Sequence, residues 1–172
     1  MSARSFSKVA PAVWRSRRFI GIPDEAKVGF LYLLSNAHVT SAGVYELPPG
    51  YACADLCWTE AAYESVLKEL VGAELIDRED EVILIERWFK HNAPTNDDHA
   101  IGTRRRLQAI ESDRLREKAI ASFDDVNAAR IEREAQKAAE KAAKAAGRSQ
   151  SVSELLGNTS RLMETRLMRG GK

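Results

Sequence analysis

The sequence lacks the features that mark secreted and membrane proteins. It contains only two cysteines in 172 residues, too few for a framework of disulfide bonds. No apolar run approaches the length that crosses a lipid bilayer. Residues 1–10 contain no apolar stretch of the length found in a secretory signal peptide. These absences predict a cytoplasmic protein that has no membrane partner.

Motifs for catalysis and cofactor binding are also missing. The sequence has no G-x-x-x-x-G-K-[ST] phosphate loop, no G-x-G-x-x-G dinucleotide motif and no H-E-x-x-H zinc motif. Cys53 and Cys57 could be combined with His91 and His99, but their C-x3-C and H-x7-H spacings differ from those of zinc sites. We therefore expect no enzyme activity, no cofactor and no metal, and we interpret both cysteines as small buried thiols.

The net charge is small, at +1, but the charges are unevenly distributed. Residues 1–20 contain five basic and no acidic residues, and residues 129–172 contain ten basic and five acidic residues. Residues 59–90, in contrast, contain nine acidic and four basic residues. Two basic ends therefore flank an acidic middle, and any contact with a polyanion is expected at the ends.

Hydrophobic periodicity predicts a compact domain over residues 21–92, behind a basic N-terminal arm at residues 1–20. The expected elements are a helix at about 23–37, a strand at 43–47, helices at 51–57 and 61–74, and a hairpin of 75–77 with 82–85. The first helix is apolar on nearly every side and is expected to be buried. Thr59 is a suitable cap for the helix that follows it. The second hairpin strand is apolar on both faces, which predicts a central or covered position. This order predicts a mainly α fold with a small β-hairpin, specifically a winged helix-turn-helix domain.

The rest of the chain divides into three segments by composition. Residues 93–126 form a helical extension, in which Asp97 or Asp98 caps a helix that contains three consecutive arginines. Residues 127–153 form a spacer rich in alanine, lysine and glutamate, and we expect residues 147–153 to interrupt its helix. Residues 154–172 form a short amphipathic tail with paired leucine and methionine residues.

Residues 13–92 contain a series of short motifs of core and turn residues. They are Val13-Trp14, Phe19, Pro23-Asp24-Glu25-Ala26-Lys27, Leu31-Tyr32-Leu33-Leu34, Gly43-Val44-Tyr45-Glu46-Leu47, Ala54-Asp55-Leu56-Cys57-Trp58-Thr59, Leu67, Leu70, Leu75-Ile76 and Trp88-Phe89-Lys90-His91-Asn92. This arrangement resembles the N-terminal domains of phage replication initiation proteins, the replisome organisers, and of their bacterial DnaD-like relatives. The resemblance implies a winged helix that binds DNA or self-associates, in a bacterial or phage-infected cell. It also implies a tail that engages the replicative helicase or its loader.

Candidate DNA contacts are basic side chains of the arm, of the recognition helix and of the helical extension. They are Arg15, Arg17, Arg18, Lys68, Arg104, Arg105 and Arg106. A basic arm can enter a minor groove or follow the phosphate backbone. The arginine triplet points in different directions on a helix, so that one or two members reach phosphates while another pairs with Asp97, Asp98 or Glu111. The alternative for the arm is a solvated basic terminus that Trp14 and Phe19 partly anchor.

The expected helix-turn-helix surface matches DNA poorly. The recognition helix, residues 60–72, would expose Glu60 and Glu64 as well as Lys68. At the hairpin tip, four carboxylates surround one arginine: Asp77, Glu79, Asp80 and Glu81 around Arg78. Phosphate binding requires cations at the phosphates, and this surface offers few. Two interpretations of this surface therefore stay open. The helix docks in a major groove, or the acidic surface of the domain contacts a protein.

The three tryptophans are interpreted as core residues, because large aromatic side chains contribute most to burial. They are Trp14, Trp58 and Trp88. For Trp58 the alternative is stacking on a nucleic-acid base.

The tail supplies the candidate partner contacts, since an amphipathic segment with apolar anchors commonly docks in a groove. These anchors are Leu155, Leu156, Leu162, Met163, Leu167 and Met168. The hypothesis favoured by the sequence is a DNA-binding replication initiation protein of phage type that recruits or organises a helicase or another replisome partner, with homo-oligomer formation as an option. The alternatives are a winged-helix transcriptional regulator, and a protein-binding adaptor that uses its acidic surface.

Overall fold

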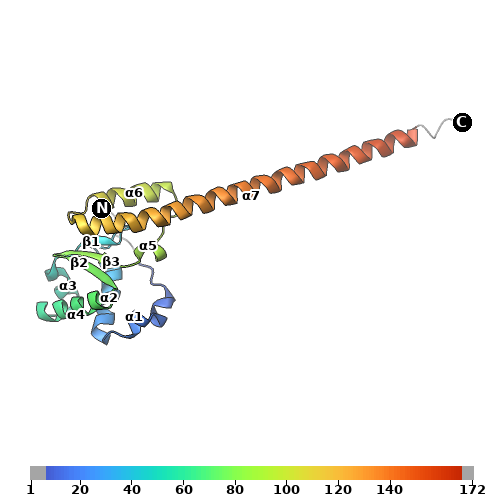
Figure 1. Ribbon diagram of the computed structural model, residues 1–172. Helices are drawn as coiled ribbons and strands as arrows, with labels where there is room; N and C mark the ends of the chain where they lie inside the picture. The colour runs from blue at the N-terminus through green and yellow to red at the C-terminus, as the bar shows by residue number, and fades with distance from the viewer. Residues whose placement is uncertain (1–6, 168–172) are drawn as a thin grey trace. The chain divides into compact units, whose positions relative to one another are not determined.

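The computed structural model describes the backbone of residues 7–167 and the side chains of residues 7–144. Its elements in chain order are η1 (Pro11–Arg15), α1 (Arg17–Ile20), α2 (Asp24–Ser35), β1 (Val44–Glu46), α3 (Pro49–Leu56), α4 (Glu60–Gly72), β2 (Ile76–Glu79), β3 (Val82–Ile85), α5 (Trp88–His91), α6 (Asp97–Gln108) and α7 (Asp113–Leu167). The chain divides into two units, Met1–Ala128 and Ala129–Lys172. The fold is mainly helical with a small antiparallel sheet, as the sequence predicts (Figure 1).

The three strands form one antiparallel sheet in the order β1-β3-β2. Val44 pairs with Leu84 on one side of β3, and Ile76 pairs with Ile85 on the other. The predicted hairpin of β2 and β3 is confirmed, and so is the central position of β3. Because β3 has a strand on each edge and is covered on both faces, the alternation of apolar and polar residues expected of a half-exposed strand is absent from it.

Helices α2 and α4 pack closely against each other. Thr59 caps α4, since its side-chain oxygen accepts a hydrogen bond from the backbone nitrogen of Ala62. The close approach depends on Gly29 of α2, where an added Cβ would lie 2.5 Å from Cγ1 of Val66 on α4. The helix predicted at 61–74 is therefore present and seated against α2.

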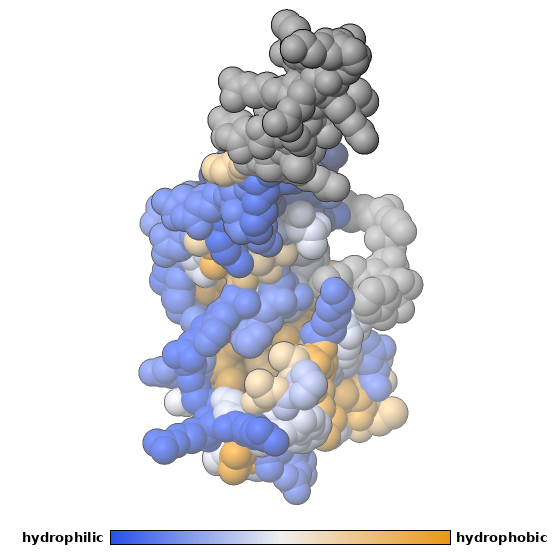
Figure 2. All heavy atoms as spheres, turned by 90° about the vertical axis from the view of Figure 1, so that its right-hand side faces the viewer, coloured by the Kyte–Doolittle hydropathy of each residue, from blue (hydrophilic) through white to orange (hydrophobic). Residues whose placement is uncertain are grey.

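The expectation that α2 is buried on every side is wrong. Val28 is 49% exposed, whereas Ala26, Phe30 and Leu33 are buried. Helix α2 has a core-facing side and a solvent-facing side, and an exposed apolar residue on the second side is ordinary for a folded protein. On the face drawn in Figure 2, apolar surface lies between strips of hydrophilic side chains.

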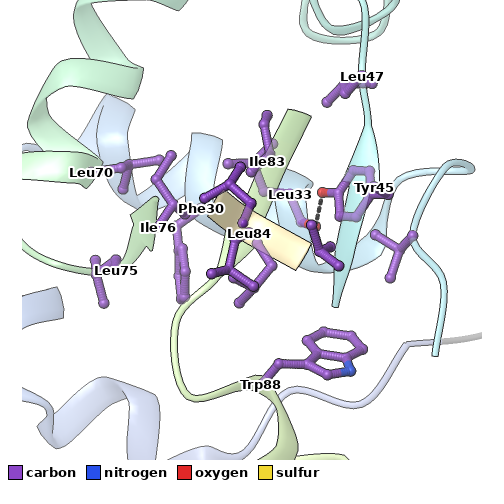
Figure 3. Close-up of a cluster of buried hydrophobic side chains, with 14 of the residues drawn as sticks. Phe30, Leu33, Tyr45, Leu47, Leu70, Leu75, Ile76, Ile83, Leu84 and Trp88 are labelled. Carbon is purple, nitrogen blue, oxygen red and sulfur yellow. Dashed lines mark hydrogen bonds between the residues drawn. The ribbon is translucent and has the colours of Figure 1, made fainter. Parts of the chain in front are cut away.

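The core lies between α2, α4 and the sheet, and Figure 3 shows its central side chains. Ile83 and Leu84 of β3 point to opposite sides within this cluster, and both are buried. Tyr45 of β1 donates a hydrogen bond from its hydroxyl to the backbone oxygen of Leu33, which joins the sheet to the end of α2. Burial raises the pKa of the Tyr45 hydroxyl above its ordinary range, so this group remains a neutral donor.

The first unit also includes α6 and the start of α7. Leu107 of α6 and Leu115 and Phe123 of α7 belong to the same core as the sheet. Helix α6 begins after Asn96, whose side-chain oxygen accepts a hydrogen bond from the backbone nitrogen of His99 at 2.8 Å. The prediction that Asp97 or Asp98 is the cap is therefore wrong by one position. Asparagine is as good an N-cap as aspartate, and both aspartates lie in the first turn.

The helical backbone of α7 continues to Leu167, so the predicted interruption at residues 147–153 is wrong. One glycine, Gly147, costs a helix only about 1 kcal/mol relative to alanine. The alanine and charged residues around it favour helix enough to outweigh this cost. In the second unit, Glu140 and Lys144 form an i,i+4 ion pair of the kind that supports an exposed helix.

Within residues 7–167, no helix is both long enough and apolar enough to span a lipid bilayer.

Candidate nucleic-acid interface

The basic segment near the N-terminus is folded on the domain between residues 11 and 20. Arg15 ends η1, and Arg17 and Arg18 begin α1. Phe19 anchors α1 in the core at 1% exposure. Arg18 donates a hydrogen bond to the backbone oxygen of Glu74 at 2.5 Å, and it lies 3.5 Å from the carboxylate of the same residue. Arg18 is therefore held in place by its contacts with Glu74.

The structure brings three of the seven predicted DNA contacts together. Arg17 and Arg18 of α1 and Lys68 of α4 line one shallow hollow on the surface. Glu69 and Glu74 also line it, and Glu74 is the residue that pairs with Arg18. Arg17 and Lys68 are exposed and form no ion pair within residues 7–144. They are thus the two cations of this hollow that are free to meet phosphates.

The arginine triplet on α6 lies elsewhere, at the end of the first unit opposite α1 and α4 (Figure 1). Arg104 lies over the ring of Phe123, at 5.3 Å from its centroid, and pairs with Asp124. The predicted partners Asp97, Asp98 and Glu111 are therefore wrong for this residue. The sequence does not predict this contact, because the two residues are 20 positions apart and meet only where α7 packs beside α6.

The other two members of the triplet differ in their availability. Arg106 donates a hydrogen bond to the hydroxyl of Ser41 at 2.8 Å. Arg105 is exposed, and no described side chain pairs with it. Arg105 is therefore the member of the triplet that is best placed to reach a phosphate.

The acidic hairpin is partly neutralised within the fold. Asp77 accepts hydrogen bonds from Arg114 at 2.9 and 3.1 Å and from Lys118 at 2.7 Å. Lys118 also pairs with Glu86, and the hydroxyl of Ser112 donates to a carboxylate oxygen of Glu79. The carboxylates of β2, together with Glu86 just after β3, therefore hold the start of α7.

Asp80 and Glu81 are the carboxylates of this hairpin that stay exposed. Arg114 and Lys118 are not among the functional residues that the sequence predicts. Their i,i+4 spacing does show that the two cations share one helix face. It does not show their partner, because Asp77 lies 37 residues from Arg114 and 41 residues from Lys118 in the chain.

Arg78 fastens the hairpin to α4. Its guanidinium donates two hydrogen bonds to the carboxylate oxygens of Glu64, at 2.9 and 3.0 Å. Glu64 is therefore half-buried and engaged, which corrects the expectation that it is an exposed position of the recognition helix. Glu60 is exposed as predicted.

Replacing Asp77 with asparagine is expected to lower the free energy of unfolding at neutral pH by about 1–2 kcal/mol, because the charged acceptor of three hydrogen bonds is lost. Burial alone would raise the pKa of Asp77, but the hydrogen bonds from Arg114 and Lys118 outweigh it and hold this pKa below its ordinary value. The stabilisation is therefore complete above the unfolded-state pKa of about 3.9, and it is lost as the pH falls through the lower pKa of the folded state.

Urea unfolding of the two proteins over a pH series measures this effect. The gap between them should be constant near neutrality and close below about pH 4. Glu81→Gln is the matched control, because it neutralises an exposed carboxylate of the same hairpin. An Asp77→Asn protein as stable as the parent at pH 7 would show that these contacts do not hold α7.

The tryptophans and cysteines are only partly where the sequence predicts them. Trp88 is buried and Trp58 is half-buried against the core, but Trp14 is 59% exposed, which corrects its assignment to the core. Trp14 contacts Phe19 edge-on, with ring centroids 5.3 Å apart, and its other side faces solvent. Cys57 is exposed, not buried, because it is the left-handed cap that ends α3.

No group of three or more potential ligands among the described residues could hold a metal ion.

The predicted partner contacts of the tail fall outside the described side chains. Leu155, Leu156, Leu162, Met163 and Leu167 lie on the helical backbone of α7, and Met168 lies outside the described residues altogether.

The described part of the chain is thus a mainly helical domain with a three-stranded antiparallel sheet, and two separate groups of arginine and lysine side chains lie on its surface. No family model, no curated protein and no solved structure matches the chain.

Proposed function

We propose that the first unit is a winged helix-turn-helix domain that binds DNA, and that the chain is a replication initiation protein of phage type. The element order α2-β1-α3-α4-β2-β3 supports the first part, because it places two successive helices before a β-hairpin. The observation that carries the proposal of DNA binding is the grouping of Arg17, Arg18 and Lys68 around one hollow. This grouping joins cations that are about 50 residues apart in the printed sequence.

The charge pattern of the folded domain suits phosphates better than the sequence alone suggested. Asp77 is neutralised by Arg114 and Lys118, so the hairpin repels a polyanion less than its composition implies. Arg17 and Lys68 project from different helices, and each can meet a phosphate oxygen with release of a counterion. Contacts of this kind position a duplex without reading its sequence.

The role in replication rests on the motifs at residues 13–92 and on the amphipathic tail at residues 154–172, which would contact a helicase, its loader or another replisome partner. A transcriptional regulator and a protein-binding adaptor remain the alternatives. A short palindromic footprint near a promoter would favour the regulator. For an adaptor, the exposed carboxylates Glu60, Asp80 and Glu81 would contribute to the contact surface.

The double variant Arg17→Glu, Lys68→Glu is expected to weaken binding to random-sequence duplex DNA by about tenfold or more, because two phosphate contacts are replaced by repulsion. Fluorescence anisotropy of a labelled duplex at two salt concentrations measures both the affinity and its salt dependence. The slope of log affinity against log salt concentration should fall by about two for the variant.

The matched control is Lys137→Glu, Lys141→Glu, which makes the same change of charge on exposed lysines of the second unit. It should retain most of the affinity and of the salt slope. If both double variants lose affinity equally, binding depends on net charge alone and the hollow is not the interface. Weak binding of the parent with no salt slope would reject DNA binding and leave the adaptor.

A further inference from the structure

A semi-enclosed cavity of about 260 Å³ lies in the first unit, between the N-terminal segment and the core. Val9, which precedes η1, and Val13, which lies in η1, form one wall. Phe30, Leu75 and Trp88 contribute to the floor. Its apolar lining differs from the shallow, charged hollow beside Lys68.

Cations from two segments of the chain line this cavity. Lys8 comes from the N-terminal segment, Arg87 precedes α5, and Lys90 lies within α5. All three side chains belong to exposed residues, and none of them forms an ion pair within residues 7–144. Their charge is therefore available to a ligand.

The carboxylates of the lining are already engaged. Glu74 accepts the ion pair from Arg18, and Glu86 pairs with Lys118 at 2.5 Å. Within residues 7–144, neither carboxylate forms an ion pair with Lys8, Arg87 or Lys90. The cavity thus combines an apolar interior with a positive rim.

We propose that this cavity binds an acidic peptide segment of a partner protein through one large apolar side chain. Its volume is below the roughly 300–1,000 Å³ of pockets for drug-sized molecules, and it suits a single buried anchor of the kind that dominates protein interfaces. Carboxylates that flank that anchor would meet Lys8 of the N-terminal segment and Lys90 of α5. Charge complementarity then determines which partner segments are accepted.

The lining favours a peptide over a single-stranded nucleic acid. Bases are usually held by stacking on accessible aromatic rings, whereas Trp88 is 5% exposed and Phe30 is 7% exposed. The part of the lining formed by Val9 and Val13 is aliphatic and offers no hydrogen-bonding group to the edge of a base.

The test uses the full chain and a fluorescein-labelled peptide in which one phenylalanine lies between runs of glutamate. Saturable binding is expected by anisotropy, and replacing the phenylalanine with serine should weaken it by about tenfold. Val13→Trp should fill the cavity and weaken binding by a similar factor. The surface variant Lys8→Glu, Lys90→Glu leaves the core untouched and should weaken binding by about tenfold and reduce its salt dependence.

Lys137→Glu, Lys141→Glu is again the matched control, and it should bind the peptide like the parent. Equal binding of the serine peptide, or unchanged binding by both the Val13 and the Lys8, Lys90 variants, would overturn the proposal. It would also be overturned if the parent bound labelled oligothymidine or octanoate at this cavity but not the peptide.

Discussion

Replacing Phe123 with alanine is expected to lower the free energy of unfolding of the first unit by about 4 kcal/mol, in the range measured when buried aromatic side chains are truncated. The side chain is 1% exposed. Its ring contacts that of Phe89, with the two centroids 5.3 Å apart. Arg104 also lies over the ring of Phe123, with Cζ 5.3 Å from the centroid. Truncation therefore removes an aromatic pair and a cation–π contact as well as leaving a cavity.

Urea unfolding followed by tryptophan fluorescence measures this loss in the first unit, because all three tryptophans lie between residues 14 and 88. Ser122→Ala, at the neighbouring exposed position of α7, is the control and should change the unfolding free energy by less than about 0.5 kcal/mol. A loss of under about 1 kcal/mol for Phe123→Ala would mean that the start of α7 is not part of this core.

The hairpin shows what the sequence predicts well. Val82, Ile83, Leu84 and Ile85 form a short run of β-branched and aliphatic residues after a charged turn, and this local pattern was enough to predict a central strand. The cap at Thr59 and the helix after it were predicted for the same reason. In both cases the signal lies within one element and its nearest neighbours in the chain.

The role of the acidic hairpin shows what the sequence does not predict. The sequence predicts that Asp77 is an exposed acid, because Arg78 is the one cation among the four carboxylates of the hairpin. Its partners Arg114 and Lys118 come from a helix that begins more than 30 residues later. Pairing of this kind depends on the tertiary arrangement, which local composition does not contain. The same reason explains the pairing of Arg104 with Asp124.

The sequence predicts the residues of the candidate interface but not their grouping, which also depends on tertiary contacts. Basic residues can be recognised by type, so Arg17, Arg18 and Lys68 were all named, but their grouping depends on the contact of α1 with the end of α4. Burial is also only a tendency of residue type. Trp14 is exposed because η1 is a single short turn at the surface, and one edge of the ring is enough to anchor it on Phe19.

The cavity beside Trp88 could not be anticipated at all. It exists because the segment that carries Val13 passes over the floor formed by Phe30 and Leu75 without filling the space. No periodicity or motif reports the fit between two segments that are distant in sequence. Lys8 and Lys90 are ordinary charged residues until the fold places both of them in its lining.

Gly43→Ala is expected to lower the free energy of unfolding by about 3 kcal/mol, from two separate costs. Gly43 has a φ of +67°, a conformation that costs an L-residue with a side chain roughly 1–2 kcal/mol. An added Cβ would also lie 2.0 Å from Cγ of Trp88, and overpacking of a core typically costs 1–3 kcal/mol. Neither side of this contact can easily yield: the oxygen of Gly43 accepts from the nitrogen of Ile85 at 2.8 Å, and the indole nitrogen of Trp88 donates to the oxygen of Ser41 at 2.9 Å.

Gly50→Ala is the matched control, because it makes the same chemical change on α3 with no atom within 4 Å of the added Cβ. Alanine is favoured over glycine inside a helix by about 0.5–1 kcal/mol, so this variant should be as stable as the parent or slightly more stable. Urea unfolding at one pH compares the three proteins. Equal stability of Gly43→Ala and Gly50→Ala would contradict the close contact between Trp88 and Gly43, the residue before β1, and with it the floor of the cavity on which the proposed peptide site depends.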